Sequence, residues 1–298
     1  MTQQPQELLF GSFITPSVDR IEQVVELTRL SERAGLDLAT FQDHPYQPRL
    51  LDSWTLISYL AAATSRIRLA PNVMNLPMRQ PVVIARSAAS LDLLSGGRVE
   101  LALGAGGFWD AIEAIGGRRL SPGESIDALE EAITVIREIW DTDTRGGVRV
   151  DGSHYQVAGA KRGPAPAHDI GIWVGAYRPR ILRLVGRVAD GWVPSLSYLE
   201  GGLAGLAEAS RHLDEGAQAA GRDPAAIHRL LNIGDHFTPD GSPVLTGPLV
   251  QWAGQLAEIS VEYGVTGYIL AGDNPTTIQQ FGEEVAPAVR ELVAKART

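Results

Sequence analysis

The alternation of strands and helices along this chain predicts an α/β fold, a single-domain TIM (β/α)₈ barrel. Eight short runs rich in Val, Ile and Leu recur along the 298 residues, and each is followed by a longer segment with helical periodicity. An open doubly wound sheet would alternate in the same way. The count of eight, and a composition that stays uniform from residue 1 to residue 298, favour one closed barrel.

The first four strand–helix units are defined by apolar runs and by residues that end helices. Strands are expected at residues 8–16, 36–44, 67–75 and 99–107, because each is a short apolar run. Helices are expected at residues 18–35, 52–64, 80–95 and 125–140, where apolar residues recur at helical spacing. Asp52 or Ser53 can cap the second helix, and Gly96 with Gly97 closes the third.

The last four units follow an interruption. Residues 141–168 are too polar for a core and too long for an ordinary connection, which indicates an insertion before strand 5. Within it, residues 148–150 and 155–157 can pair as a small hairpin. Strands are then expected at residues 171–177, 191–197, 228–238 and 265–272, and helices at residues 179–190, 203–220, 247–264 and 276–296.

Composition excludes several classes of function. The net charge of −9 argues against nucleic acid or an anionic membrane as partner, and the start of the chain has no signal-peptide pattern, so we expect a cytoplasmic protein. The sequence has no cysteine, and no two of its six histidines stand at metal-binding spacing, so no metal site is expected. Lys161 and Lys295 are the only lysines and lie away from the strand ends, which argues against a Schiff base.

Chemistry in such a barrel gathers at the carboxyl ends of the strands. The second strand ends there in Asp43-His44, followed by Pro45 and Pro48, which stiffen the loop. The fourth ends in Gly104, Gly106 and Gly107, a turn that does not match a dinucleotide fingerprint because the third glycine comes too early. The fifth ends just before a helix that starts near Pro179, and such a helix start can bind an anion.

Several motifs in the same order resemble the luciferase-like monooxygenase superfamily. They are Asp43-His44, "AAATSRIRLAPNV" at 61–73, "SLDLLSGGRVELALGAG" at 90–106, "WVGAYRP" at 173–179 and "VADGWVPS" at 188–195. The resemblance implies a TIM barrel that binds FMN or the deazaflavin coenzyme F420. It implies a cis peptide between Asn72 and Val73 behind the ring. It places Gly106 and Gly107 beside the cofactor, and Gly175, Ala176, Arg178 and Pro179 around its phosphate.

The Asp43-His44 pair resembles the pair that is usual at this position in the F420-using branch of the family. There Asp43 would contact the deazaflavin or orient the imidazole, and His44 would lie near the hydride-transferring carbon. The alternative cofactor is FMN. The structural alternatives are that His44 is a hydrogen-bonded residue with no role in proton transfer and that Asp43 caps a loop. Members that oxidise hexose phosphates have a glutamate where this chain has Gly107, so that activity is not expected.

The expected reaction is hydride transfer between F420 and a small, partly apolar organic substrate. The expected substrate pocket contains Tyr46, Phe108, Trp109, Tyr198 and His236, although a pair such as Asp235-His236 more often caps a loop. The first alternative is an FMN monooxygenase that receives reduced flavin from a separate reductase, and the second is a flavin-binding protein without turnover. Similar proteins are commonly homodimers, so the resemblance also implies a homodimer.

Overall fold

Eight parallel strand positions close on themselves in the computed structural model, which describes residues 6–234, 245 and 249–297. The order around the barrel is β1, β2, β3 with β4, β5, β8, β9, β10 and β11, and β11 pairs with β1 again. The strands are β1 (Leu9–Ile14), β2 (Leu38–Phe41), β3 (Arg68–Pro71), β4 (Met74–Asn75), β5 (Leu101–Gly104), β8 (Ile172–Val174), β9 (Gly191–Trp192), β10 (His228–Ile233) and β11 (Gly267–Ala271). This confirms the predicted barrel.

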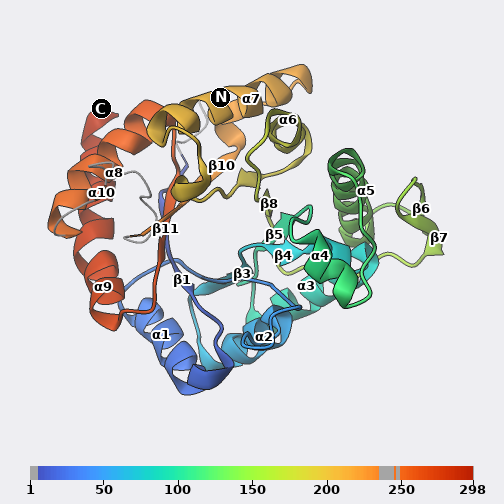
Figure 1. The fold of residues 1–298 in the computed structure, drawn as a ribbon, viewed down its shortest axis with the longest axis horizontal. Coiled ribbons are helices and arrows are strands. Elements are labelled where there is room, and N and C mark those ends of the chain that lie inside the picture. Colours follow the sequence, from blue (N-terminus) through green and yellow to red (C-terminus); the bar gives the residue numbers. More distant parts are fainter. Residues whose placement is uncertain (1–5, 235–244, 246–248, 298) are drawn as a thin grey trace.

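Helices surround the strands on all sides (Figure 1). They are α1 (Ile21–Arg33), α2 (Ser53–Ala63), α3 (Pro81–Ser95), α4 (Trp109–Ala114), α5 (Pro122–Trp140), α6 (Pro179–Val188), α7 (Leu203–Ala219), α8 (Leu249–Tyr263), α9 (Pro275–Gln280) and α10 (Ala286–Ala296). Their starts follow from local chemistry. Asp52 caps α2 by accepting a hydrogen bond from the Thr55 amide at 2.8 Å, and Ser121 forms a capping box with Glu124 at the start of α5.

The structure corrects several predicted boundaries. The third strand is interrupted at Asn72-Val73, so that β3 pairs with β2 and β4 pairs with β5. The short helix α4 was not predicted, because its six residues give too little periodicity. The predicted last helix is divided by a π-helical turn at Phe281–Val285. Residues 235–238 of the seventh predicted strand and residues 247–248 of a predicted helix lie outside the described residues.

A layer of apolar side chains fills the inside of the barrel below its carboxyl ends. Each strand position contributes one buried residue to it: Leu9, Leu38, Ala70, Ala102, Trp173, Val193, Leu230 and Ile269. A second, larger apolar cluster packs between the strands and the helices. The inside is therefore a packed core rather than a channel, and ligands can enter only from the ends.

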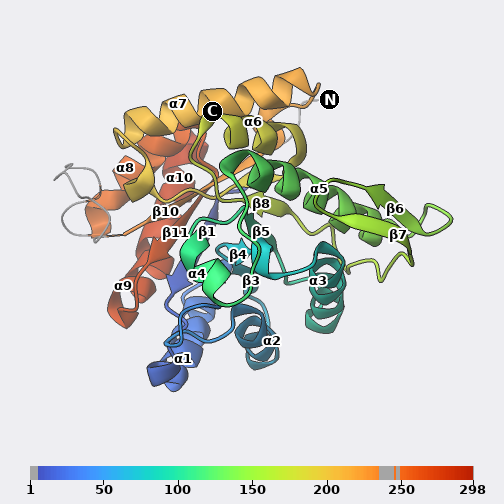
Figure 2. The same cartoon turned by 45° about the vertical axis from the view of Figure 1, so that its right-hand side comes forward.

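The predicted insertion forms a hairpin of β6 (Val148–Asp151) and β7 (Gln156–Ala160), outside the barrel sheet. Figures 1 and 2 show it projecting beside α5. The carboxylate of Glu131 on α5 holds it by accepting hydrogen bonds from the amides of Ser153, His154 and Tyr155 at 2.8–2.9 Å. No helix among residues 6–234 and 249–297 is long and apolar enough to cross a membrane.

Candidate functional site

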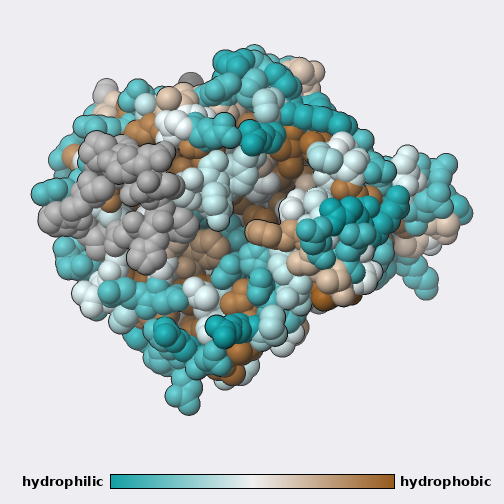
Figure 3. All heavy atoms as spheres, viewed as in Figure 1, coloured by the Kyte–Doolittle hydropathy of each residue, from teal (hydrophilic) through white to brown (hydrophobic). Residues whose placement is uncertain are grey.

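A cavity of about 1410 Å³ opens at the carboxyl ends of the strands. Figure 3 shows it as a hollow near the middle of the face, with apolar side chains on its walls. Residues that follow β1, β2, β4, β5, β8, β9 and β11 line it, so almost every strand contributes to one site. Ligand pockets for drug-sized molecules usually measure about 300–1000 Å³, so this cavity has room for a cofactor together with a substrate.

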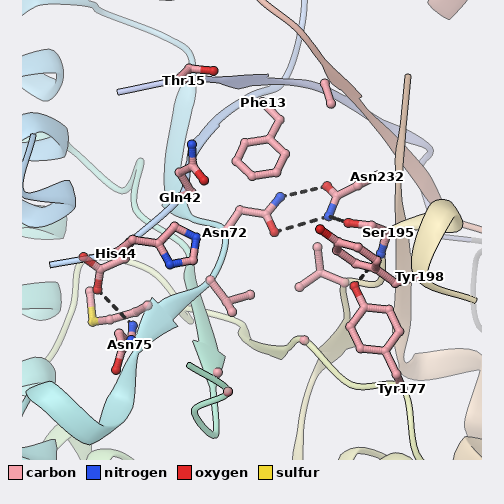
Figure 4. Close-up of a pocket in the computed structure, with 18 of the residues that line it drawn as sticks. Phe13, Thr15, Gln42, His44, Asn72, Asn75, Tyr177, Ser195, Tyr198 and Asn232 are labelled. Carbon is pink, nitrogen blue, oxygen red and sulfur yellow. Dashed lines mark hydrogen bonds between the residues drawn. The ribbon is translucent and has the colours of Figure 1, made fainter. Parts of the chain in front are cut away.

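Three residues directly after β2 line the cavity: Gln42, Asp43 and His44. Gln42 and His44 point into it (Figure 4). Asp43, between them, turns its buried carboxylate toward the loop after β4, where it accepts a hydrogen bond from the Asn75 amide at 2.9 Å and pairs with Arg79 at 3.1 Å. Arg79 also pairs with Asp52 at 2.7 Å. Asp43 is therefore committed to holding the backbone behind the site.

The imidazole of His44 forms its hydrogen bond with a residue other than Asp43. Its Nδ1 lies 2.7 Å from the hydroxyl of Tyr46. This corrects the expectation that Asp43 orients the imidazole. The ring of Phe108 meets the imidazole edge-on, with centroids 5.5 Å apart. Partial burial lowers the pKa of His44, and the negative charge of Asp43 opposes this shift. The lowered pKa favours a neutral imidazole at neutral pH.

Two asparagines join across the floor of the cavity. Asn72 follows β3 and Asn232 lies on β10, which are on opposite sides of the barrel. The Asn72 amide donates to Asn232 Oδ1 at 2.8 Å, and Asn232 donates in return at 3.3 Å and also to Ser195 Oγ at 3.2 Å (Figure 4). All three side chains are buried. Asn232 and Ser195 were not predicted. A polar residue at an inward position of a barrel strand is the signal that would have indicated Asn232.

A wall of small residues lies beside this floor. The Asn72-Val73 peptide is cis, as the resemblance implied. The side chain of Val73 packs against the backbones of Gly104 and Gly175, where a Cβ atom would lie 2.7 Å and 3.3 Å from it. Gly107 has no atom within 4 Å of a would-be Cβ, so its backbone is open to the cavity. The backbone there is accessible to a flat ligand. Asn75 adds a buried Oδ1 that has no hydrogen-bond partner in the structure.

The predicted phosphate-binding residues lie where α6 begins. Gly175, Ala176 and Arg178 line the cavity, and the side chain of Arg178 is exposed and pairs with Glu200 at 3.3 Å. Pro179 is the first residue of α6 and lines a neighbouring pocket of about 220 Å³ rather than the main cavity. The start of the helix therefore faces the region between the two pockets, with one cationic side chain beside it.

The predicted substrate residues are distributed unevenly. Tyr46, Phe108 and Tyr198 line the cavity, and the last two are 63% and 68% exposed at its rim. Trp109 does not line it. Its ring lies behind Gly106, 2.7 Å from where a Cβ would stand, which corrects the prediction. His236 lies outside the described residues. Tyr177, another aromatic residue at this face, accepts a hydrogen bond from the Ser195 amide at 2.9 Å and meets Tyr198 edge-on.

Within residues 6–234, 245 and 249–297, no group of three or more His, Asp or Glu side chains is arranged to hold a metal ion. The polar residues that line the cavity supply an imidazole, amides, hydroxyls, the guanidinium of Arg178 and the carboxylates of Asp43 and Asp273. Such groups are suited to binding and orienting an organic ligand and to moving a proton.

Comparison with known proteins adds relatives across most of the chain. The family model of the luciferase-like monooxygenases matches residues 3–239. An F420-dependent glucose-6-phosphate dehydrogenase of Mycolicibacterium fortuitum is 28% identical, over 92% of this chain and 88% of that protein. A 5,10-methylenetetrahydromethanopterin reductase of Archaeoglobus fulgidus is 28% identical, over 97% of this chain and 79% of that protein.

A solved structure shares the fold. The F420-dependent secondary alcohol dehydrogenase in complex with an F420-acetone adduct superimposes with a TM-score of 0.80 at 19% identity, over 95% of this chain and 99% of the other. The family model covers well over half of the sequence, and its range contains the strand ends that build most of the cavity. The chain belongs to the luciferase-like monooxygenase family.

Proposed function

We propose that this protein is an oxidoreductase that uses the deazaflavin coenzyme F420 to transfer a hydride to or from a small, partly apolar organic substrate. The observation that carries the proposal is the position of His44. Its imidazole lies on the wall of a 1410 Å³ cavity, beside the glycine wall and the asparagine floor. Relatives named as F420-dependent enzymes support the choice of cofactor.

The residues of the cavity fit such a cofactor. A flat tricyclic ring needs a wall without side chains, and Gly104, Gly107 and Gly175 provide one around Val73. The unpaired Oδ1 of Asn75 offers a hydrogen-bond acceptor to a ring N–H. Gly175, Ala176 and Arg178 are the residues that would hold the phosphate, with Gly106 alongside. When bound, the deazaflavin supplies a carbon that carries the hydride.

His44 has the role of moving a proton at the substrate. Because Nδ1 is engaged by Tyr46, Nε2 is the ring nitrogen that is available to a ligand. A positioned acid or base of this kind contributes about 10²–10⁴-fold to a rate. Asp43 remains a proposed cofactor contact through the part of it that borders the cavity.

The lining favours a neutral substrate. Phe108 and Tyr198 present exposed rings at the rim. Among the described residues that line the cavity, Arg178 is the one that carries a full positive charge, and the proposal assigns it to the cofactor. A sugar phosphate would need a second cationic site, so we do not carry the substrate of the dehydrogenase relative over to this chain.

The second candidate is an FMN-dependent monooxygenase that receives reduced flavin from a separate reductase and uses oxygen. The family to which the chain belongs favours it, because that family is named for monooxygenases. The third, a flavin-binding protein without turnover, would bind a cofactor and show no reaction with any reduced donor.

A titration of the protein with F420 and with FMN, each oxidised and reduced, tests the proposal. We expect tight binding of F420 and at least tenfold weaker binding of FMN. The reverse order would favour the monooxygenase, and failure of both to bind would refute the proposed function. The variant His44→Ala should bind F420 within a few-fold of wild type and lose most of its turnover. Unchanged turnover would refute the role of His44.

We further propose a cytoplasmic homodimer that joins through the outer faces of α2 and α3. Those faces expose Tyr59, Val83, Leu93 and Leu94, and Leu94 is 85% exposed. Apolar side chains gathered on neighbouring helices are typical of an interface. Light scattering on the wild type should give the mass of a dimer, and Leu94→Asp should give a monomer. A wild-type monomer at micromolar concentration would contradict this arrangement.

A further inference from the structure

Among the described residues, Tyr46 is the one that forms a hydrogen bond with the His44 imidazole, and the two are two residues apart on a loop that Pro45 restrains. The hydroxyl lies 2.7 Å from Nδ1, and the two ring centroids are 5.5 Å apart. The nearest carboxylate in sequence, Asp43, is occupied by Asn75 and Arg79. The hydrogen bond with Tyr46 therefore decides the tautomer in which the imidazole faces the cavity.

This hydrogen bond can be formed in two ways. Either Tyr46 donates its O–H to Nδ1 and the ring proton is on Nε2, or the ring donates Nδ1–H to the phenol oxygen and Nε2 has a free lone pair. A phenol is a stronger acid than a neutral imidazole, and an imidazole nitrogen is a stronger base than a phenol oxygen. The O–H···N arrangement is therefore the more stable one.

The surroundings keep both groups in the required charge state. Partial burial lowers the pKa of His44, and burial together with the charge of Asp43 raises the pKa of Tyr46. At neutral pH the imidazole is neutral and the phenol keeps its proton. No acid in direct contact with the imidazole competes with Tyr46 for Nδ1 among the described residues.

We propose that Tyr46 is a positioning residue that holds His44 in the Nε2–H tautomer, so that the resting site offers a hydrogen-bond donor to the carbonyl oxygen of an aldehyde or ketone substrate. This inference rests on the proposed function for its substrate, although its statement about the tautomer does not. The inference predicts that the cofactor-loaded protein binds the aldehyde or ketone in preference to the alcohol.

The proton steps balance around this pair. When bound, the reduced deazaflavin would supply the hydride that reaches the carbonyl carbon, so that the C=O double bond becomes a C–O single bond. The oxygen takes the proton from Nε2, and Nδ1 takes the hydroxyl proton of Tyr46. A proton from solvent goes to the phenol oxygen, which lies on a half-buried side chain next to the exposed Pro45. After the alcohol leaves, exchange of the ring proton with water restores the Nε2–H tautomer. The products are an alcohol and oxidised deazaflavin.

The tautomer is measured on the cofactor-free protein by NMR with ¹⁵N-labelled histidine. The chemical shifts of the two ring nitrogens distinguish the Nε2–H and Nδ1–H forms, and His44→Gln assigns the signals. We expect the Nε2–H form in the wild type and a mixture of the two in Tyr46→Phe. The matched control Tyr198→Phe, which removes another hydroxyl from the same rim, should leave the His44 shifts unchanged. A wild-type Nδ1–H form, or no change in Tyr46→Phe, would overturn the inference.

Kinetics test the substrate part of the inference. With reduced F420 and a panel of aldehydes and ketones, Tyr46→Phe should lower kcat by about 10–100-fold and change KM by less than about threefold. The loss in kcat/KM should be equal in the reductive and oxidative directions, because a variant cannot change the equilibrium. An unreactive amide should inhibit the wild type more strongly than the matching alcohol does, and Tyr46→Phe should reduce that preference. Equal inhibition in the wild type would overturn the substrate class.

The two possible failures can be told apart. Absence of F420 binding would refute the proposed function while the NMR result still decides the tautomer. If F420 binds but the tautomer is Nδ1–H, the proposed function stands and the role of Tyr46 is wrong. Because the wild-type tautomer is measured without any substitution, poor folding of Tyr46→Phe would not prevent the test.

Discussion

The stability of this barrel should depend on pH through His168, at the end of the barrel opposite to the cavity. His168 is the last residue of the insertion, and its Nδ1 lies 2.9 Å from Asp92 Oδ1 while its Nε2 lies 3.6 Å from Glu100 Oε1. Asp92 also accepts hydrogen bonds from the amides of Ala167 and His168. The ion pairs therefore join the insertion to the third helix and to the start of β5.

The size of the effect follows from the pKa shift. Glu100 and Asp92 raise the pKa of His168 to about 9, against the opposing effect of partial burial. From the ordinary value of 6.5 this is a rise of about 2.5, and each pKa unit corresponds to about 1.4 kcal/mol. The interaction of protonated His168 with Asp92 and Glu100 should therefore contribute at most about 3.5 kcal/mol to the free energy of unfolding. The side chain is 31% exposed, so solvent screening should reduce the measured value toward about 1–2 kcal/mol.

The sign is fixed by the direction of the shift. A pKa raised in the folded state means that the contribution is complete below about pH 6.5 and is lost as the pH rises through about 9. Urea unfolding of wild type and His168→Gln, followed by circular dichroism from pH 6 to pH 10, isolates this contribution, because other titrating groups are shared. The difference between the two should be largest at pH 6 and vanish near pH 10. Two parallel curves over this range would refute the reasoning.

Two further contacts between distant parts of the chain can be tested by substitution. Gly186→Ala places a Cβ against the Leu213 carbonyl of α7 and should lower the free energy of unfolding by about 1–3 kcal/mol, whereas Gly254→Ala in α8, with open space around it, should raise it by up to about 1 kcal/mol. Equal urea midpoints for the two would contradict the close approach of α6 and α7. Asn232→Ala removes both hydrogen bonds between the two buried amides, leaves Asn72 Nδ2 with the longer bond to Thr40 Oγ1 at 3.3 Å, and should lower the free energy of unfolding by about 1–3 kcal/mol. Asn72→Ala should lower the free energy of unfolding less in the Asn232→Ala variant than in the wild type. Strict additivity of the two losses would argue against the amide pair.

Much of the fold was predictable because it depends on local patterns. Each strand is an apolar run and each long helix has a helical stripe, so the count of eight units and the insertion before strand 5 can be read from the sequence. Strand boundaries were less predictable. The strand after residue 67 stops at Pro71 and resumes at Met74 because its two halves pair with different neighbours. That choice depends on how the barrel closes.

The sequence by itself determined that His44 and the glycines after β5 stand at the carboxyl face, since strand order and strand ends are properties of the local chain. Only the tertiary structure decided which groups meet there. Asn72 and Asn232 are 160 residues apart and touch because a closed barrel brings opposite strands within reach of one side chain each. Asp43 adjoins His44 in sequence, yet its carboxylate contacts Arg79 and the Asn75 amide, whereas the imidazole of His44 forms its hydrogen bond with Tyr46. Covalent neighbours are fixed by the sequence, whereas contacts between side chains depend on closure of the barrel.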